Sequence, residues 1–255
     1  MSVTEAWHVA RTLRAMELLA LGERSAPELA DALGIHVRTA RRILRCMEAE
    51  GYVALSGDRR RRYRPTMRIV AVAGQVVERA ELTQTAIEHV RTLRDELGED
   101  CHLGVPSHLS VLCLVHEPGN VASGCRPRLR ELVPCHCTAS GKALLAWREA
   151  WREAVLAQPL TPFTDRTATG RQWLGRELAR IVARGYAIED REFDARARGV
   201  AAPVISASGE PVAALAVVAP ASRLPAERYS DVGETVMRAA QALSQELRPE
   251  QRVRS

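Results

Sequence analysis

Two short amphipathic segments separated by a glycine lie between residues 25 and 50. Ser25, followed three residues later by Glu28, forms a capping-box pattern that starts a helix. Gly34 ends this helix, because glycine readily adopts the left-handed conformation found at helix C-termini. A further helix begins after His36. The sequence therefore predicts two short helices joined by a tight turn, which is a helix-turn-helix.

The helix after His36 has an apolar side and a basic side. Its apolar residues recur at helical spacing and are expected to face inward: Ala40, Ile43, Leu44 and Met47. The opposite side carries Arg38, Thr39, Arg41, Arg42 and Arg45. Such a helix fits the major groove of DNA, where arginine can donate two hydrogen bonds to guanine. We expect these five side chains to be divided between bases and phosphates.

A β-hairpin is predicted after this helix. Residues 52–55 have the character of a strand, and Gly57-Asp58 supplies a turn. The returning strand and its tip are basic, and four arginines are expected to contact the DNA backbone or the minor groove: Arg59, Arg60, Arg61 and Arg62. Residues 1–65 thus read as a winged helix-turn-helix domain.

The first helix of this domain is predicted from about Glu5 to Leu21. Apolar side chains recur along it at helical spacing and are expected to face the core: Val9, Leu13, Met16 and Ala20, with Leu19 beside them. Residues 1–65 contain twelve basic and eight acidic side chains, whereas the remaining 190 residues have a surplus of only one positive charge. This asymmetry indicates a polyanionic partner for the N-terminal part of the chain.

A linker helix is predicted over residues 66–81, and an α+β domain over residues 82–255. This second domain begins with a helix that ends at Gly98. Its strands are predicted at 101–105, 109–115, 186–189, 200–206 and 212–218, and its further helices at 138–147, 172–184 and 229–247. We expect an antiparallel sheet with helices packed on one face, and a loop between residue 115 and Pro134.

The cysteine content and the apolar runs indicate the compartment. Six cysteines without C-x2-C spacing, and a start that lacks the pattern of a secretion signal, are typical of a reducing environment. The longest apolar run, Val212 to Ala219, is too short to span a membrane. We therefore expect a cytoplasmic protein that has no membrane partner.

Several short motifs occur together in the chain, in a specific order and spacing. They are LADALG at 29–34, PCHCTASGKALLA at 134–146, GYAIED at 185–190, AAPV at 201–204 and VAALAV at 212–217. With these motifs the chain resembles the IclR family of bacterial transcription regulators over nearly its full length. The resemblance implies a winged helix-turn-helix domain, a C-terminal GAF-like effector-binding domain, and a homodimer or a dimer of dimers. It also implies a repressor or activator that binds a small-molecule effector and double-stranded DNA at a pseudo-palindromic operator.

The family's effector site, carried over by motif, falls at Ala139, Ser140, Glu189, Asp190, Gly199, Ala216 and Val218. The free N–H groups of a helix that starts after Thr138 form an anion site, although Ser140 and Gly141 are also residues that simply start a helix tightly. Members that bind small hydroxy or keto acids have serines on the last strand and a cysteine before the AAPV run. This chain has Ala216, Val218 and Gly199 there, so we expect a weakly polar organic or aromatic acid, or no effector.

The sequence offers two alternatives to a transcription regulator, a metal- or thiol-based sensor and an enzyme. A metal- or thiol-based sensor would use Cys and His residues of the second domain: Cys101, His102, Cys113, His116, Cys125, Cys135, His136 and Cys137. Their spacing does not match a zinc framework, so we expect neither metal nor cofactor. Gly141-Lys142 lacks the glycine that a phosphate-binding loop requires five positions earlier. We expect that the protein is not an enzyme.

Overall fold

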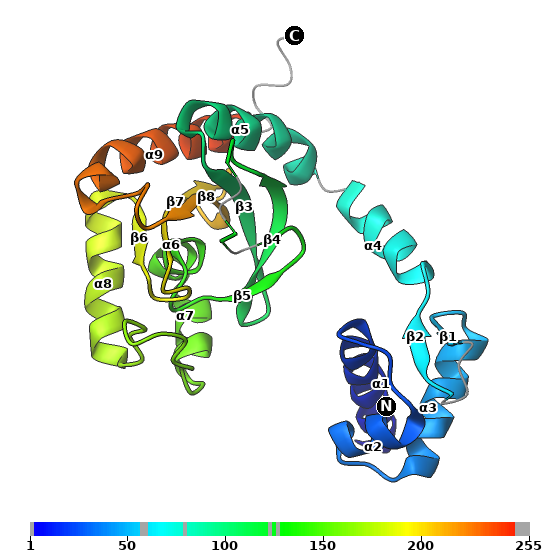
Figure 1. Ribbon diagram of the computed structural model, residues 1–255. Coiled ribbons are helices and arrows are strands. Elements are labelled where there is room, and N and C mark those ends of the chain that lie inside the picture. The colour runs from blue at the N-terminus through cyan, green and yellow to red at the C-terminus, as the bar shows by residue number, and fades with distance from the viewer. Residues whose placement is uncertain (1–2, 57–60, 79–80, 122–123, 126–127, 248–255) are drawn as a thin grey trace. The chain divides into compact units, whose positions relative to one another are not determined.

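The computed structural model describes residues 3–56, 61–78, 81–121, 124–125 and 128–247 (Figure 1). The chain divides into two compact units, residues 1–80 and residues 81–255. No described helix is both long enough and apolar enough to cross a bilayer.

The first unit is a three-helix domain with a small hairpin and a further helix. Its elements are α1 (Val3–Ala20), α2 (Ala26–Leu33), α3 (Val37–Ala49), β1 (Val53–Leu55), β2 (Tyr63–Pro65) and α4 (Arg68–Glu78). β1 pairs with β2 in antiparallel fashion, so that Leu55 lies opposite Tyr63. The predicted turn at Gly57-Asp58 lies outside the described residues, as do Arg59 and Arg60.

The helix-turn-helix forms as its sequence signals predict. Ser25 Oγ accepts a hydrogen bond from the Glu28 amide, and a Glu28 carboxylate oxygen accepts one from the Ser25 amide, which completes the capping box. Gly34 ends α2 with φ +62°, in the left-handed region. Ile43, Leu44 and Met47 of α3 are buried, as predicted. These contacts fix the side of α3 that remains exposed.

The apolar side of α1 does not face the core as predicted. Val9 is 53% exposed and Leu13 is 63% exposed, whereas the helix contributes Ala15 and Leu19 to the core. α1 carries apolar residues on more than one side, and only the tertiary packing selects the side that is buried. Of the predicted inward face, Met16 is half-buried against the core and Leu19 beside it is buried, whereas Val9, Leu13 and Ala20 lie on an exposed apolar surface.

The second unit is built on one six-stranded sheet. Its elements are α5 (Glu81–Leu97), β3 (Asp100–Ser107), β4 (Ser110–Glu117), β5 (Leu132–Pro134), α6 (Ala139–Trp147), α7 (Glu149–Leu156), α8 (Arg171–Arg184), β6 (Ala187–Asp190), β7 (Ala197–Ile205), β8 (Pro211–Pro220), a 3-10 turn (Ala226–Arg228) and α9 (Tyr229–Glu246). The strand order is β5-β4-β3-β8-β7-β6, and each neighbouring pair is antiparallel. The predicted α+β class is confirmed.

Helices cover both faces of this sheet, so the prediction that they pack on one face is wrong. α5 and α9 pack on one face, and α6, α7 and α8 pack on the other (Figure 1). The reason is visible in β8, where Leu215 and Val217 belong to the first core and Ala214 and Ala216 to the second. A strand that is apolar on both sides must be covered on both sides.

Besides the 3-10 turn, the sequence did not predict β5 and α7. β5 is only three residues long, which is too short to show an alternating pattern, and it lies within the segment that we expected to be a loop. α7 follows α6 after Arg148, and its last two residues, Val155 and Leu156, are buried against the core shared with α6 and α8. Its short apolar segment gives little periodicity to detect.

Candidate DNA interface and effector site

The outer side of α3 carries the predicted basic residues. The side chains of Arg38, Arg41, Arg42 and Arg45 are exposed, and that of Thr39 is half-buried. The helix starts at His36, whose Nδ1 accepts a hydrogen bond from the amide of Arg38 at 3.2 Å. Four guanidinium groups on one side of a short helix can supply both base-reading donors and phosphate contacts.

Arg42 is held from the neighbouring helix. Its Nη2 lies 2.7 Å from Nε2 of His8 on α1, which restricts the guanidinium to one edge of the basic side. Arg41 and Arg45 lie toward the other edge, where they line a polar cavity of about 620 Å3 together with Ser25 and Arg61. The exposed side of α3 thus continues onto the start of α2 and the hairpin.

The described wing arginines have different surroundings. Arg61 is exposed and has a positive φ of 49°. Arg62 instead forms an ion pair with Glu28, with Nη2 and Oε1 2.6 Å apart, and its side chain is only 33% exposed. Arg62 therefore ties the hairpin to the capping box of α2, a role that the arginine count alone did not reveal.

The start of α6 lies against the sheet of the second unit. Thr138 caps this helix by accepting a hydrogen bond from the Gly141 amide at 3.3 Å. The first turn of any α-helix leaves amide groups without an intrahelical partner. Ala139 and Ser140 occupy this turn and are 3% and 2% exposed, respectively. The helix N-terminus therefore presents N–H groups inside the domain, where a bound anion would be shielded from water.

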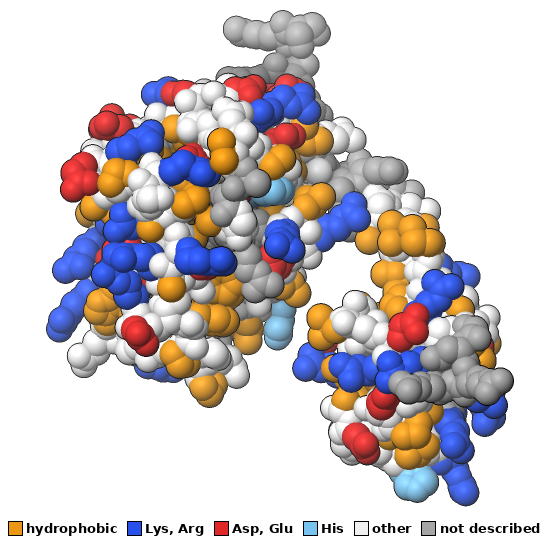
Figure 2. Space-filling view, in the orientation of Figure 1, with side chains coloured by type: hydrophobic (Ala, Val, Ile, Leu, Met, Phe, Trp, Pro, Cys, Tyr) orange, Lys and Arg blue, Asp and Glu red, His pale blue; other side chains and the backbone are white. Residues whose placement is uncertain are grey.

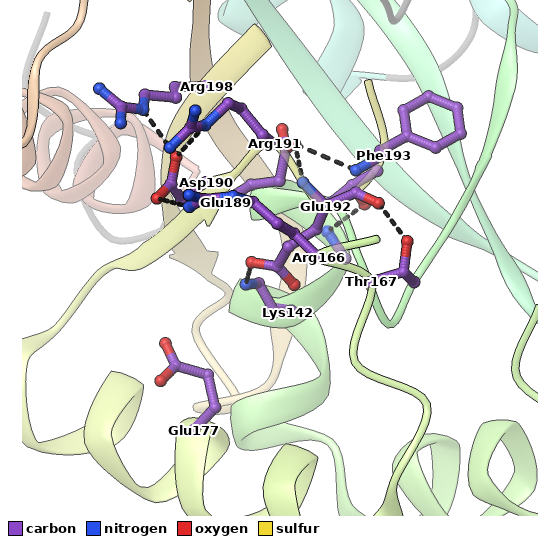
Figure 3. Close-up of polar contacts among 12 residues, drawn as sticks. Lys142, Arg166, Thr167, Glu177, Glu189, Asp190, Arg191, Glu192, Phe193 and Arg198 are labelled. Carbon is purple, nitrogen blue, oxygen red and sulfur yellow. Dashed lines mark hydrogen bonds and ion pairs between the residues drawn. The ribbon is translucent and has the colours of Figure 1, made fainter. Parts of the chain in front are cut away.

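The strand register brings most of the predicted effector residues together. Glu189 pairs with Gly199, and Gly199 pairs with Val218, so three neighbouring strands place these residues in one row. A Cβ atom on Gly199 would lie 3.3 Å from the Cβ of Ala139 and 3.3 Å from Oε2 of Glu189. Ala216 belongs to the core on the same side of the sheet. Asp190 is the exception, because it follows Glu189 and points away from this row (Figure 3).

Glu189 is buried and forms the acidic end of this row. Burial raises the pKa of its carboxyl group to about 8, although backbone hydrogen bonds and Lys142 favour the charged form. Glu189 Oε1 accepts hydrogen bonds from the amides of Glu192 and Phe193, at 3.1 and 3.2 Å. The carboxyl group therefore fixes the turn at residues 189–193 and is largely protonated at neutral pH.

Asp190 is bound by arginines on the outer side of the same turn. Its carboxylate accepts hydrogen bonds from Arg198, Arg191 and Arg166, at 2.7, 3.0 and 2.8 Å. Burial opposes its ionisation, but the hydrogen bonds from Arg198 and Arg191 outweigh this effect and lower the pKa of Asp190. Because its carboxylate is bound by these three arginines, Asp190 does not point toward the other predicted effector residues at the start of α6.

A buried ion pair that sequence reasoning missed links α6 to this turn. The Nζ of Lys142, the single lysine of the chain, contacts Oε1 of Glu192, and both side chains are buried (Figure 3). Burial raises the pKa of Glu192, and the ammonium of Lys142 partly offsets this shift. The hydroxyls of Thr164 and Thr167 add hydrogen bonds to the carbonyls of Arg191 and Glu192. Lys142 belongs to the motif at residues 134–146, but only its burial shows that it needs a partner.

The described cysteines of the second unit are free thiols, and they do not gather with other ligand residues around a metal site. Among the described residues, no group of three His, Cys, Asp or Glu side chains is placed to hold a metal ion. Cys101, Cys113, Cys135 and Cys137 are buried. Burial raises the pKa of the Cys113 thiol to about 12 and raises those of the other three as well. Such thiols are poor nucleophiles and poor metal ligands at neutral pH.

Solved structures and curated proteins share this architecture. A crystal structure of an IclR homologue complexed with 4-hydroxybenzoate, from Microbacterium hydrocarbonoxydans, is 28% identical, with a TM-score of 0.78, and the match covers 94% of this chain and 98% of that one. The HTH-type transcriptional regulator XynR of Escherichia coli is 29% identical over 92% of this chain and 95% of its own length. The probable transcriptional regulator SauR of Cupriavidus necator is 30% identical over 84% of this chain and 86% of its own.

Family models match both units. A helix-turn-helix domain matches residues 13–64, and the C-terminal model of the bacterial transcriptional regulator IclR matches residues 74–245. The second match alone covers well over half of the chain and includes the α6 N-terminus and the turn after β6. The chain therefore belongs to the IclR family of bacterial transcriptional regulators.

Proposed function

We propose that the protein binds a pseudo-palindromic operator as a homodimer or a dimer of dimers, and that an organic acid bound in its second unit controls this binding. The basic side of α3 is the observation that supports DNA binding most directly. Its arginines are exposed on a rigid helix whose other side is fixed by the core, and rigid presentation is what base recognition in the major groove requires. In Figure 2, basic side chains are prominent on this unit.

In this proposal, Arg38, Thr39, Arg41, Arg42 and Arg45 contact bases and phosphates. Arg59, Arg60 and Arg61 approach the phosphate backbone or the minor groove from the wing. Arg62 is also proposed to approach DNA there. Because it pairs with Glu28, its main proposed role is to position the wing relative to α2. Two α3 helices related by a two-fold axis would read half-sites separated by about one helical turn, roughly 34–36 Å, or a multiple of it.

Self-association is supported by apolar surface on the first unit. Leu13 of α1 and Val72 of α4 are exposed, and with Met16, Tyr52 and Ile69 they line an apolar cavity of about 470 Å3. Apolar side chains are also visible along α4 in Figure 2. A second copy of the chain is the proposed partner of this surface, since an operator with two half-sites requires two DNA-binding units.

A weakly polar acid, aromatic or otherwise, is the proposed effector class. The amides at the start of α6 suit a carboxylate, while Ala216 and Val218 offer only apolar contacts on the adjacent strand. The relative that binds 4-hydroxybenzoate supports this class. The effector would act by binding more tightly to one arrangement of the paired DNA-binding units than to another.

Fluorescence anisotropy with DNA that flanks the protein's own gene tests the proposal. The expected result is tight binding to one segment and weaker binding to a scrambled segment of equal length at the same salt concentration. An organic acid of the proposed class should change the affinity for the first segment only. Equal affinity for both segments would contradict sequence-specific binding.

A further inference from the structure

One buried imidazole beside the effector residues lacks a hydrogen-bond partner. His102 on β3 is 2% exposed, and no described residue forms a hydrogen bond with its Nε2. Buried polar atoms are nearly always paired in folded proteins, and leaving one unpaired costs stability. An unpaired buried nitrogen therefore calls for an explanation, and a bound ligand with a hydrogen-bonding group is one that fits a ligand-binding domain.

The strand register places His102 on the same side of the sheet as α6. It pairs with Ala216 of β8 and with His116 of β4. Gly104, two residues further along β3, faces the start of α6, because a Cβ there would lie 3.3 Å from the Cβ of Ser140. Alternate residues of a strand point to the same face, so His102 lies beside the α6 N-terminus.

The residues around His102 on this face are mostly small or apolar. Ala216 pairs with His102 on one side and with Ala201 on the other, and Gly199 and Val218 form the next row of the sheet. None of these four side chains has a polar atom. His102 therefore adds a polar group beside the small side chains of Ala216 and Ala201, while acidic residues, Asp100 on β3 and Glu189 on β6, lie at the two ends of the next row.

The imidazole is neutral in this environment. Burial, together with the neighbouring His116, lowers the pKa of His102 to about 3, and Asp100 only partly opposes this shift. A neutral imidazole has one N–H donor and one acceptor nitrogen and does not attract a carboxylate by charge. A hydroxyl group can donate or accept, so it matches Nε2 in either tautomer.

We propose that His102 is a specificity-determining residue of the effector site, and that its Nε2 hydrogen-bonds a hydroxyl group of an aromatic acid whose carboxylate lies at the N-terminus of α6. This inference rests on the proposed function, which places an acid effector in the second unit. The acid is held at two ends, by the amides of Ala139 and Ser140 and by His102, with its ring against Ala216 and Val218.

Calorimetric titration of the full-length protein with benzoate and 4-hydroxybenzoate tests this inference, because the two probes differ by one hydroxyl group. The unmodified protein should bind 4-hydroxybenzoate about tenfold or more tightly than benzoate, which corresponds to one hydrogen bond in a buried site. His102→Leu should lose this preference, and His102→Gln, which keeps a donor and an acceptor, should retain part of it. His89→Leu is the matched control, since His89 lies on α5, on the opposite face of the sheet.

Thermal unfolding without ligand checks that the variants fold. His102→Leu removes an unpaired polar atom, so its melting temperature should not fall below that of the unmodified protein. His102→Met is a second apolar variant for the titration if the leucine does not fit. A hydroxyl preference that survives in the folded apolar variant would overturn the assignment of His102.

Binding of the operator, measured on the same samples, separates this inference from the proposed function. If neither acid binds the unmodified protein while the operator does, the inferred effector is wrong and DNA binding stands. If the unmodified protein binds neither the acids nor the operator, the missing operator binding contradicts the proposed function independently of His102.

Discussion

Glu189 shows how burial changes the chemistry of one carboxyl group. Its pKa rises from 4.5 to about 8, mainly because burial penalises the charged form. In the unfolded chain the same group has its ordinary pKa. The folded state therefore holds a proton that the unfolded state releases between these two values, and this difference stabilises the fold most at low pH.

Replacing Glu189 with Gln should make stability less dependent on pH. Between about pH 5 and pH 8, the free energy of unfolding of the original protein should fall as pH rises, by up to about 1.4 kcal/mol per pH unit from this group. Urea unfolding at several pH values measures the slope for both proteins. All other groups titrate in the same way in the original protein and in the Glu189→Gln variant. If the free energy of unfolding depends on pH equally in the two proteins, Glu189 has its ordinary pKa in the folded state.

The guanidinium of Arg42 on α3 contacts His8 of the neighbouring helix α1, with Nη2 and Nε2 2.7 Å apart. If it reads a guanine, Arg42→Ala should weaken operator binding by about 1–3 kcal/mol and relax the preference at one base position. Anisotropy with a set of single-base operator variants measures both effects. Arg14→Ala, on the exposed side of α1, is the control. Unchanged operator affinity would remove Arg42 from the recognition residues.

Among the elements, α6 and the turn at residues 189–193 depend on each other. Lys142 is 1% exposed, and its contact with Glu192 joins the helix that starts at the proposed effector site to the turn after β6. A buried ion pair is costly to break, because the remaining charge stays buried without compensation, whereas an apolar pair of similar volume is often tolerated. The intact pair is therefore expected to fix the geometry of α6 and the turn, and to add little net stability compared with an apolar pair in its place.

Lys142→Met should lower the free energy of unfolding by about 3–5 kcal/mol, and the double variant Lys142→Met/Glu192→Leu should recover most of this loss. Denaturant unfolding of the two variants measures the difference. The exposed pair of Arg91 and Glu88 provides the comparison, since Arg91→Met should cost less than about 1 kcal/mol. A double variant as unstable as the single one would mean that the pair is not the cause.

The wing combines an exposed arginine with a paired one, and these should behave differently. Arg61→Ala should flatten the dependence of log K on log salt concentration by about 0.9, the value for one lost phosphate contact. The measurement is operator affinity over a series of salt concentrations, with Arg91→Ala in the second unit as the control. An unaltered slope would show that Arg61 does not touch phosphate.

On the scale of the whole molecule, the exposed apolar side of α1 is the main evidence for association. Leu13→Glu should convert the protein to smaller species in sedimentation equilibrium, because a charge would have to be buried in the contact. Operator affinity should fall by about 100-fold, as two linked half-site contacts become independent. Val182→Glu, at an exposed position of α8, is the control. An unchanged mass would place the contact between copies elsewhere.

Local signals in the sequence predicted much of the first unit. Ser25 and Gly34 mark the start and end of α2 through interactions within a few residues, and the apolar spacing of α3 fixes which side carries arginines. These features depend on the chain near each residue, so they can be read without the fold. The exposed side of α1 could not be predicted, because two apolar sides compete and only packing against α2 and α3 decides between them.

The sequence by itself determined the helix-turn-helix, the class of the second unit and the family, since these follow from local periodicity and from motifs in order. Tertiary structure alone decided which polar groups meet. It placed Glu192 against Lys142, fifty residues away, paired Arg62 with Glu28, and left His102 Nε2, beside Ala216, without a hydrogen-bond partner in the part of the chain that the structure describes. The physical reason is that burial and strand register set the partners and the pKa values of these groups, and neither quantity is encoded within a short stretch of chain.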